Sequence, residues 1–232
     1  MSSETKSPPK PKKIKENNFF LDFVRFTGCI PALLWTRPKV HYMGDKKKSR
    51  PQKGVLIASN HVTFIDPIAL YCVFWYRRVH FLATKDLYKN RFFGWMLTTV
   101  GCIQVDKDNF SMMSLHETVD RLKAGKAILI FPEGQVNNGQ QETLSFKSGT
   151  VLMAKLGNVP VLPIHIVRPE KRFSRYHVVI GEPVDVAGMC SRFPTVEELQ
   201  KVSDHLRDQE LLLKSYYEDK LNKKRGNKHD NT

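Results

Sequence analysis

The sequence predicts an α/β fold: a single domain with a mostly parallel central sheet flanked by helices, preceded by an N-terminal apolar helix or helical hairpin. Short apolar runs of strand length alternate along the chain with helical patterns, as is typical of parallel sheets with helical crossovers. The length of 232 residues suits one domain with tails. Apolar residues make up 41% of the chain, enough for a core and too many for a disordered protein.

The first 45 residues are predicted to stand apart from the sheet. Residues 1–17 are rich in Lys and Pro and are expected to form a disordered basic tail. Residues 18–45 are expected to form an amphipathic, membrane-associating helical segment, which is kinked at Pro31 if it is a single helix. Its apolar part, residues 19–35, is shorter than the roughly 20 residues that a membrane span needs. Its less apolar positions fall on one narrow stripe of a helix, namely Asp22, Arg25, Cys29, Ala32 and Thr36. Such a helix either lies in a membrane interface or packs on the domain with this stripe turned to polar neighbours.

Residues 46–221 are predicted to form the globular domain. A charged loop at 45–53 precedes its first expected strand. The expected strands are short apolar runs at 54–59, 79–84, 100–105, 127–131, 159–166 and 177–181. Each run is followed by a helical pattern or by turn residues, so the order of elements favours a parallel sheet with helices packed on it.

The expected helices carry recognisable start and stop signals. Pro67 opens the helix 67–76 at a first-turn position. Ser111 caps a helix that runs to about residue 123, and Gly125 follows its end. Thr195 and Glu198 form the capping box of a long C-terminal helix. Two further helices are expected at 91–99 and 148–155, and residues 222–232 are expected to be a disordered tail.

The chain is basic, with 37 Lys and Arg against 23 Asp and Glu and a net charge of +14. A field of this sign favours anionic partners, either nucleic acid or an anionic membrane surface. A nucleic-acid-binding protein would interleave its cations with exposed aromatic residues or carry a recognisable module. Neither is evident, and much of the charge is in the tails, so no nucleic-acid partner is expected.

The four cysteines indicate a reducing compartment. They lie far apart and form no C-x-x-C motif, which favours reduced core thiols over a disulfide framework or metal site. A covalent cysteine nucleophile stays an alternative without a supporting motif. No secretory signal with a small-residue cleavage site is evident. The expected location is therefore the cytoplasmic face of a membrane, as a peripheral or monotopic protein.

His61 and Asp66 are the strongest catalytic candidates. His61 directly follows a predicted buried strand, where α/β sheets place their ligands. A carboxylate bonded to one ring nitrogen fixes the tautomer and stabilises the imidazolium. The other nitrogen then takes a proton from an alcohol near neutral pH. A His-x4-Asp pair is weak evidence by itself, because such pairs also arise as structural contacts.

Further motifs strengthen the pair. After it come residues 101–107 (GCIQVDK), 131–134 (FPEG) and 159–163 (VPVLP), and shorter patterns surround Lys85 and Lys147. In this order the motifs resemble the glycerolipid acyltransferases of phospholipid synthesis, the family typified by bacterial lysophosphatidic acid acyltransferase. The resemblance covers roughly residues 50–185, and the first and third motifs together are its most specific part.

The resemblance implies direct acyl transfer without an acyl-enzyme. His61 would deprotonate the hydroxyl of a lysophospholipid, Asp66 would hold His61, and the oxygen would attack acyl-CoA or acyl carrier protein. Backbone N–H groups near residues 159–163 would be candidates for the oxyanion site. No metal or cofactor is implied beyond the acyl thioester. The matching substrate-binding positions are Asn60, Lys85, Lys107, Phe131, Glu133, Gly134 and Lys147. Glu133 as a helix-capping carboxylate and Gly134 as a turn residue stay alternatives.

Two departures from the family pattern put the acceptor in doubt. The second motif usually closes with Arg, where this chain has Lys107. The third motif usually continues Thr-Arg, where this chain has Gln135 and Val136. Arg clamps phosphate with two parallel hydrogen bonds, whereas Lys binds it as a point charge. An acceptor other than 1-acyl-sn-glycerol-3-phosphate stays open, as does a non-catalytic lipid-binding relative. A hydrolase has no Gly-x-Ser-x-Gly motif to support it.

Overall fold

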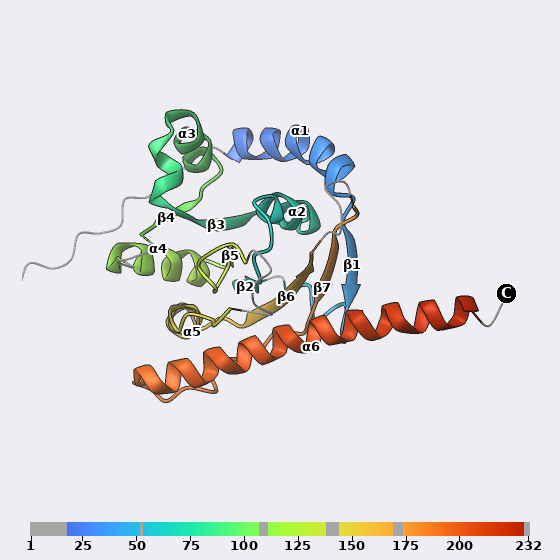
Figure 1. Ribbon diagram of the computed structural model, residues 1–232. Coiled ribbons are helices and arrows are strands. Elements are labelled where there is room, and N and C mark those ends of the chain that lie inside the picture. Colours follow the sequence, from blue (N-terminus) through green and yellow to red (C-terminus); the bar gives the residue numbers. More distant parts are fainter. Residues whose placement is uncertain (1–17, 52, 107–110, 138–143, 169–173, 230–232) are drawn as a thin grey trace, which may run out of the picture.

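The computed structural model describes residues 18–51, 53–106, 111–137, 144–168 and 174–229. These residues form one seven-stranded sheet with helices on both faces (Figure 1). The strands are β1 (Lys39–Tyr42), β2 (Val55–Ser59), β3 (Val79–Thr84), β4 (Ile103–Val105), β5 (Ala127–Ile130), β6 (Val161–Val167) and β7 (His177–Ile180). The helices are α1 (Asn18–Thr36), α2 (Asp66–Val73), the short 3-10 helix η1 (Lys85–Lys89), α3 (Arg91–Thr99), α4 (Met112–Lys123), α5 (Gly149–Gly157) and α6 (Val196–His229).

The sheet is mostly parallel, which confirms the predicted fold class. Its strand order is β1-β7-β6-β2-β5-β3-β4, and the pair β6–β7 is antiparallel while the other five pairs are parallel. Strand β2 pairs with β5 from Val55 opposite Ala127 to Ala58 opposite Ile130. The carboxyl ends of these two neighbouring strands therefore meet at one edge, which brings His61 and the segment after residue 130 together.

Alternate residues of the central strands build two separate cores. Leu56 and Ala58 of β2 pack on the face covered by α4, α5 and α6. Val55 and Ile57 pack on the opposite face, against α2. Figure 1 shows this division, with α1 and α2 above the sheet and α4, α5 and α6 below it. Burial on both faces explains why the run before His61 is continuously apolar.

The N-terminal segment departs from the prediction after Thr36. Residues 18–36 form one helix, which continues through Pro31, but Lys39–Tyr42 is strand β1 and pairs with β7. The expected helical segment 18–45 is therefore wrong in its last part: the sheet already begins at residue 39, before the predicted first strand at 54–59 and the predicted domain start at 46. Strand β1 is an edge strand of four residues with only His41 buried, so it lacks the apolar run by which the other strands were predicted.

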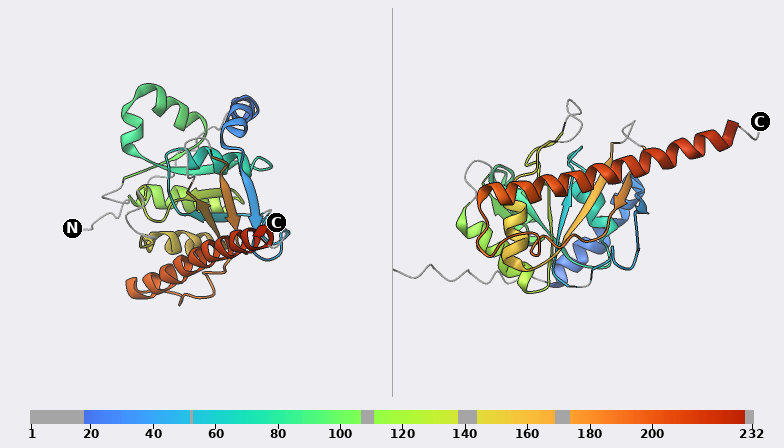
Figure 2. Two further views of the ribbon diagram at one scale, coloured as in Figure 1. Left: turned by 45° about the vertical axis from the view of Figure 1, so that its right-hand side comes forward. Right: turned by 90° about the horizontal axis from the view of Figure 1, so that it is seen from below.

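The C-terminal helix is longer than predicted. Thr195 caps it, since the N–H of Glu198 donates to the Thr195 hydroxyl at 3.2 Å. Helix α6 then runs 34 residues to His229, so residues 222–229 are helical rather than part of a disordered tail. Each added residue gains a backbone hydrogen bond once a helix is nucleated, and Lys and Arg are good helix formers. Figure 2 shows α6 crossing the domain and extending past it. The expected tails at 1–17 and 230–232 lie outside the described residues.

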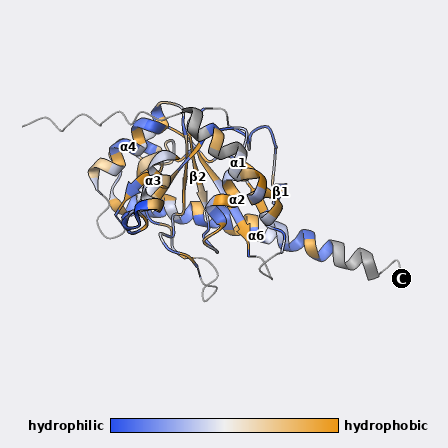
Figure 3. Cartoon of the chain, turned by 90° about the horizontal axis from the view of Figure 1, so that it is seen from above, coloured by the Kyte–Doolittle hydropathy of each residue, from blue (hydrophilic) through white to orange (hydrophobic). Residues whose placement is uncertain are grey.

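Helix α1 turns its less apolar stripe toward the domain. Cys29 and Thr36 are buried, and Asp22 forms an ion pair with Arg78 at 2.8 Å. Figure 3 shows α1 beside α2, with hydrophobic residues along both. Over the described part of the chain, no helix combines the length and apolarity needed to cross a membrane.

Candidate active site

His61 and Asp66 meet as predicted at the carboxyl end of β2. Nδ1 of His61 lies 2.9 Å from Oδ2 of Asp66, and Asp66 is the first residue of α2. An ionised carboxylate only accepts hydrogen bonds, so the proton sits on Nδ1 and leaves Nε2 as the acceptor. The side chain of Asp66 is fully buried, whereas that of His61 is 15% exposed. The ring is therefore held on one side and accessible on the other, as a general base requires.

The buried carboxylate of Asp66 receives three more donors. The backbone N–H groups of Val62 and Thr63 each donate to Oδ2 at 2.7 Å. The hydroxyl of Thr63 donates to Oδ1 at 2.6 Å. These bonds replace the hydration that burial removes from the carboxylate. They also fix its orientation, and through it the plane of the His61 ring.

Phe131, the first residue of the third motif, stacks on His61. The two ring centroids are 4.0 Å apart and the planes differ by 16°. The backbone N–H of Asn137 donates to the carbonyl of His61 at 2.6 Å. The loop after β5 thus packs on His61, which limits the rotation of its ring.

Gly134 and Lys147 are neighbours across the same loop. Gly134 has a φ of +70°, a conformation that favours glycine. A Cβ at this position would lie 2.9 Å from both Cε and Nζ of Lys147, so the lysine chain lies directly over the glycine backbone. The backbone N–H of Lys147 also donates to the carbonyl of Pro132 at 3.0 Å. The missing side chain of Gly134 therefore makes room for the Lys147 side chain.

These residues line a mainly apolar cavity of about 1200 Å³. Its walls come from α1, α2, β3, α3, the segment after β5 and the start of α5. Of the predicted site residues, the cavity lining includes His61, Phe131, Gly134 and Lys147. Lys147 is the only Lys or Arg among the described lining residues, which also include Asp86 and Asp106. The cavity thus joins an apolar volume to one histidine and one cation.

Asn60 and Lys85 lie outside the described lining. The side chain of Asn60 accepts from the N–H of Ile166 at 2.6 Å and donates to its carbonyl at 2.9 Å. Asn60 therefore clamps the end of β2 to β6, next to His61. Lys85 forms an ion pair with Asp106, which itself lines the cavity. Lys107 lies outside the described residues.

Glu133 is not among the residues of the described cavity lining. It is 5% exposed, and neither carboxylate oxygen has a hydrogen-bond partner within the described structure. Burial, followed by the negative charge of Glu210, raises the pKa of Glu133 to about 8. Glu210, on α6, pairs with His165. The Glu133 side chain therefore lies close to α6. Its predicted contact with the acceptor stays a prediction.

Two features were not anticipated from the sequence. The lining includes Gly28, Cys29 and Ala32 of α1, so the N-terminal helix forms part of the cavity wall. Tyr176 contacts the hydroxyl of Thr63 at 2.7 Å, although it stands far along the chain and belongs to no motif. Conversely, residues 159–163 contribute nothing to the described lining. Residues 161–163 pair with residues 56–58 inside β2 and so lie below the edge that carries His61.

The fold agrees with the comparison to known families. Residues 39–167 match the family model described as "Acyltransferase". The chain belongs to this acyltransferase family. The matched segment starts at β1, which supports the domain boundary found in the structure.

Individual members of the acyltransferase family show the same relationship. The 1-acyl-sn-glycerol-3-phosphate acyltransferase of Streptococcus pneumoniae is 26% identical over 183 residues, covering 76% of this chain and 67% of that protein. The enzyme of the same name from Bacillus subtilis is 26% identical over 167 residues, covering 70% and 82%. The crystal structure of PlsC, the 1-acyl-sn-glycerophosphate acyltransferase of Thermotoga maritima, superposes with a TM-score of 0.61 at 23% identity, covering 86% of this chain and 80% of that one. This last likeness confirms the fold.

Proposed function

We propose that this protein transfers a fatty acyl group from acyl-CoA or acyl carrier protein to the hydroxyl of a lysophospholipid. The first candidate acceptor is 1-acyl-sn-glycerol-3-phosphate, the substrate in the names of the relatives, which would give phosphatidic acid. The observation that carries the proposal is the His61–Asp66 pair at the end of an apolar cavity whose only described cation is Lys147.

The proposed reaction is a direct displacement. Nε2 of His61 takes the proton of the acceptor hydroxyl, and the oxygen attacks the thioester carbonyl carbon. The tetrahedral intermediate collapses, the C–S bond breaks, and the imidazolium returns its proton to the leaving thiolate. Asp66 stabilises the imidazolium between these steps. The free acceptor nitrogen and the buried partner at 2.9 Å support these roles.

The cavity suits the apolar part of the substrates. Its volume of about 1200 Å³ exceeds the 300–1000 Å³ of ordinary ligand pockets. Lys147 would bind the phosphate as a point charge, in the place of the arginine that family members carry after the third motif. Lys85, already paired with Asp106, and Lys107 would act more weakly or at the rim.

We further propose that the protein docks on the cytoplasmic face of an anionic membrane through α1 and α3, without spanning it. Both helices lie on the same side of the sheet (Figure 1) and line the cavity. Their exposed apolar residues are Phe23, Ile30, Leu33, Leu34 and Trp35 of α1 and Phe92, Phe93 and Trp95 of α3. Exposed aromatic and aliphatic side chains of this kind insert at the headgroup level. A lysolipid would then reach the cavity from the membrane.

An acceptor screen tests the proposal. Purified protein is incubated with labelled acyl-CoA or acyl carrier protein, vesicles and a panel of lysophospholipids and neutral glycerides. Transfer to lysophosphatidic acid, abolished in His61→Ala with the fold retained by circular dichroism, supports it. Turnover that persists in His61→Ala contradicts the mechanism. Thioester consumption without a new lipid product indicates hydrolysis instead.

A different acceptor is the second candidate. Gln135 and Val136 both line the cavity where the family pattern has Thr-Arg. An uncharged Val136 beside the substrate favours an acceptor with a smaller or less charged headgroup. Faster turnover of such a lysolipid than of lysophosphatidic acid in the same screen would select this candidate.

A further inference from the structure

A chain of hydroxyl groups ends on the carboxylate of Asp66. The Thr63 hydroxyl lies 2.6 Å from Oδ1 of Asp66, and the Tyr176 hydroxyl lies 2.7 Å from the Thr63 oxygen. Because the ionised carboxylate can only accept, Thr63 must donate to Asp66. Thr63 has one hydroxyl proton, so Tyr176 must donate to Thr63. The chain therefore has one direction, from Tyr176 through Thr63 to Asp66 and the His61 ring.

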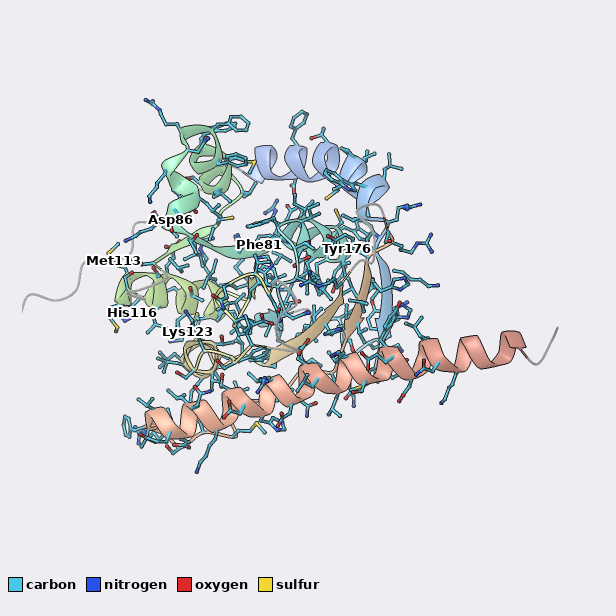
Figure 4. The ribbon with its side chains drawn as sticks, in the orientation of Figure 1. Phe81, Asp86, Met113, His116, Lys123 and Tyr176 are labelled. Carbon is cyan, nitrogen blue, oxygen red and sulfur yellow. The ribbon has the colours of Figure 1, made fainter. Side chains whose placement is uncertain are left out.

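Tyr176 is held rigidly where its hydroxyl is needed. Its side chain and backbone are 3% exposed. Its backbone N–H donates to the carbonyl of Thr36, the last residue of α1, at 3.0 Å. Its carbonyl accepts from the N–H of Lys39, the first residue of β1, at 2.7 Å. Figure 4 shows Tyr176 beside this junction of α1 and β1. These two backbone hydrogen bonds fix the position of Tyr176, so its hydroxyl lies next to Thr63 in the absence of substrate.

The environment keeps the phenol in its donating form. Burial raises the pKa of Tyr176 and is the largest influence; the contact with Thr63 opposes the rise, and the charge of Asp66 adds to it. The net direction is upward, so the hydroxyl retains its proton at neutral pH. Successive donors in such a chain polarise one another inside a protein.

We infer that Tyr176 is a positioning residue for acyl transfer: its hydroxyl, donating through Thr63, fixes the carboxylate of Asp66 and hence the ring of His61. The inference rests on the proposed function, in which His61 is the base. Tyr176 touches neither substrate nor a reacting atom in this scheme. It keeps Nε2 of His61 oriented toward the acceptor hydroxyl. The rate of proton transfer depends strongly on this orientation.

The kinetic test removes the hydroxyl and keeps the ring. Tyr176→Phe is expected to lower kcat by about tenfold, with KM within about twofold of the wild type, because the change affects geometry at the base and leaves binding intact. Thr63→Val is expected to lower kcat at least as much, and Thr63→Ser to retain it. Tyr217→Phe is the matched control, since Tyr217 is also a buried tyrosine, 6% exposed, but belongs to α6 and packs against His41 and His177 rather than against Thr63. It should leave kcat unchanged.

The double variant separates positioning from a general packing role. If Tyr176 acts through Thr63, adding Tyr176→Phe to Thr63→Val lowers kcat no further. Multiplicative losses, or wild-type kcat in Tyr176→Phe, overturn the inference while leaving the proposed function standing. Should Tyr176→Phe fail to fold, the Val and Ser variants of Thr63 decide: equal kcat in both overturns the inference.

If no acceptor in the panel is acylated, the proposed function fails. The inference about Tyr176 can still be tested by a measurement that does not depend on activity. The ¹H–¹⁵N resonance of the His61 Nδ1–H is followed by NMR in the wild type and the variants. Tyr176→Phe is expected to shift this resonance and Tyr217→Phe to leave it in place. An unshifted resonance in Tyr176→Phe overturns the inference whatever the reaction is.

Discussion

Asp66 and Glu133 are two buried carboxylates near His61, and their hydrogen-bonding environments differ. Asp66 accepts from the His61 ring, two backbone N–H groups and a hydroxyl. Glu133 has no hydrogen-bond partner in the described structure, and its pKa rises to about 8 because it is buried and faces Glu210. Burial alone favours the neutral acid, whereas donors keep an ion in place. Donors therefore surround the carboxylate that holds the His61 ring.

Replacing Asp66 by Asn is expected to give the largest effect. The amide oxygen can still accept from the three N–H donors at the Oδ2 position, but the side chain is neutral, so a His61 imidazolium loses its charge partner. We expect kcat to fall by about 10³-fold or more, with KM little changed, as measured by steady-state acyl transfer. The fold is checked by circular dichroism. Activity within tenfold of the wild type would show that Asp66 and Glu133 do not differ in role.

Replacing Lys147 by Met is expected to have the next largest effect. Lys147 lies over Gly134 and is not among the groups that shift the pKa of Glu133, which leaves its charge for the substrate. Loss of one charged hydrogen bond of about 1.5–3 kcal/mol raises KM for lysophosphatidic acid by about 10- to 100-fold. KM for a neutral acceptor should not change. An equal change for both acceptors would place the phosphate elsewhere.

The exposed apolar side of α1 gives a third test. Leu34 is 73% exposed, so Leu34→Glu should leave the fold intact and weaken sedimentation with anionic vesicles by about tenfold, given roughly 1.5–3 kcal/mol for burying a leucine. Lys201→Glu on α6, at an exposed position away from α1 and α3, is the matched control. Equal loss of vesicle binding in both variants would point to charge rather than α1.

Replacing Glu133 by Gln is expected to change activity least and to alter the pH dependence of stability. In the unfolded chain Glu133 ionises near its ordinary pKa of 4.5, but in the folded protein only near 8. The wild type therefore loses stability as pH rises from about 4.5 to about 8, because the folded state keeps the proton that the unfolded state releases. Glutamine does not titrate. The Tm difference between variant and wild type should grow in favour of the variant from pH 5 to pH 9.

An equal Tm difference at both pH values would show that Glu133 is ionised in the folded protein. A large loss of kcat in Glu133→Gln, comparable with Asp66→Asn, would show that Glu133 acts in the reaction although it is not among the described lining residues. Together the two amide variants measure how far the environments of the carboxylates differ.

The site could be predicted where strand order decides it. His61 and Phe131 each follow an apolar strand of a parallel sheet, so their proximity follows from the pattern alone. Strand β1 could not be predicted in this way, because a polar edge strand carries no apolar run. The extension of α6 beyond residue 221 was missed because polar composition distinguishes poorly between a helix and a disordered tail.

The sequence by itself determined the fold class, the pairing of His61 with Asp66, and the family of the chain, because these depend on local spacing and on the order of strands. Only the tertiary structure decided which way each side chain turns beyond the strand ends. In the folded protein Glu133 lies near α6, Lys147 lines the cavity, and Tyr176 contacts Thr63. Such directions depend on contacts between segments far apart in the chain, and no local pattern of residues encodes them.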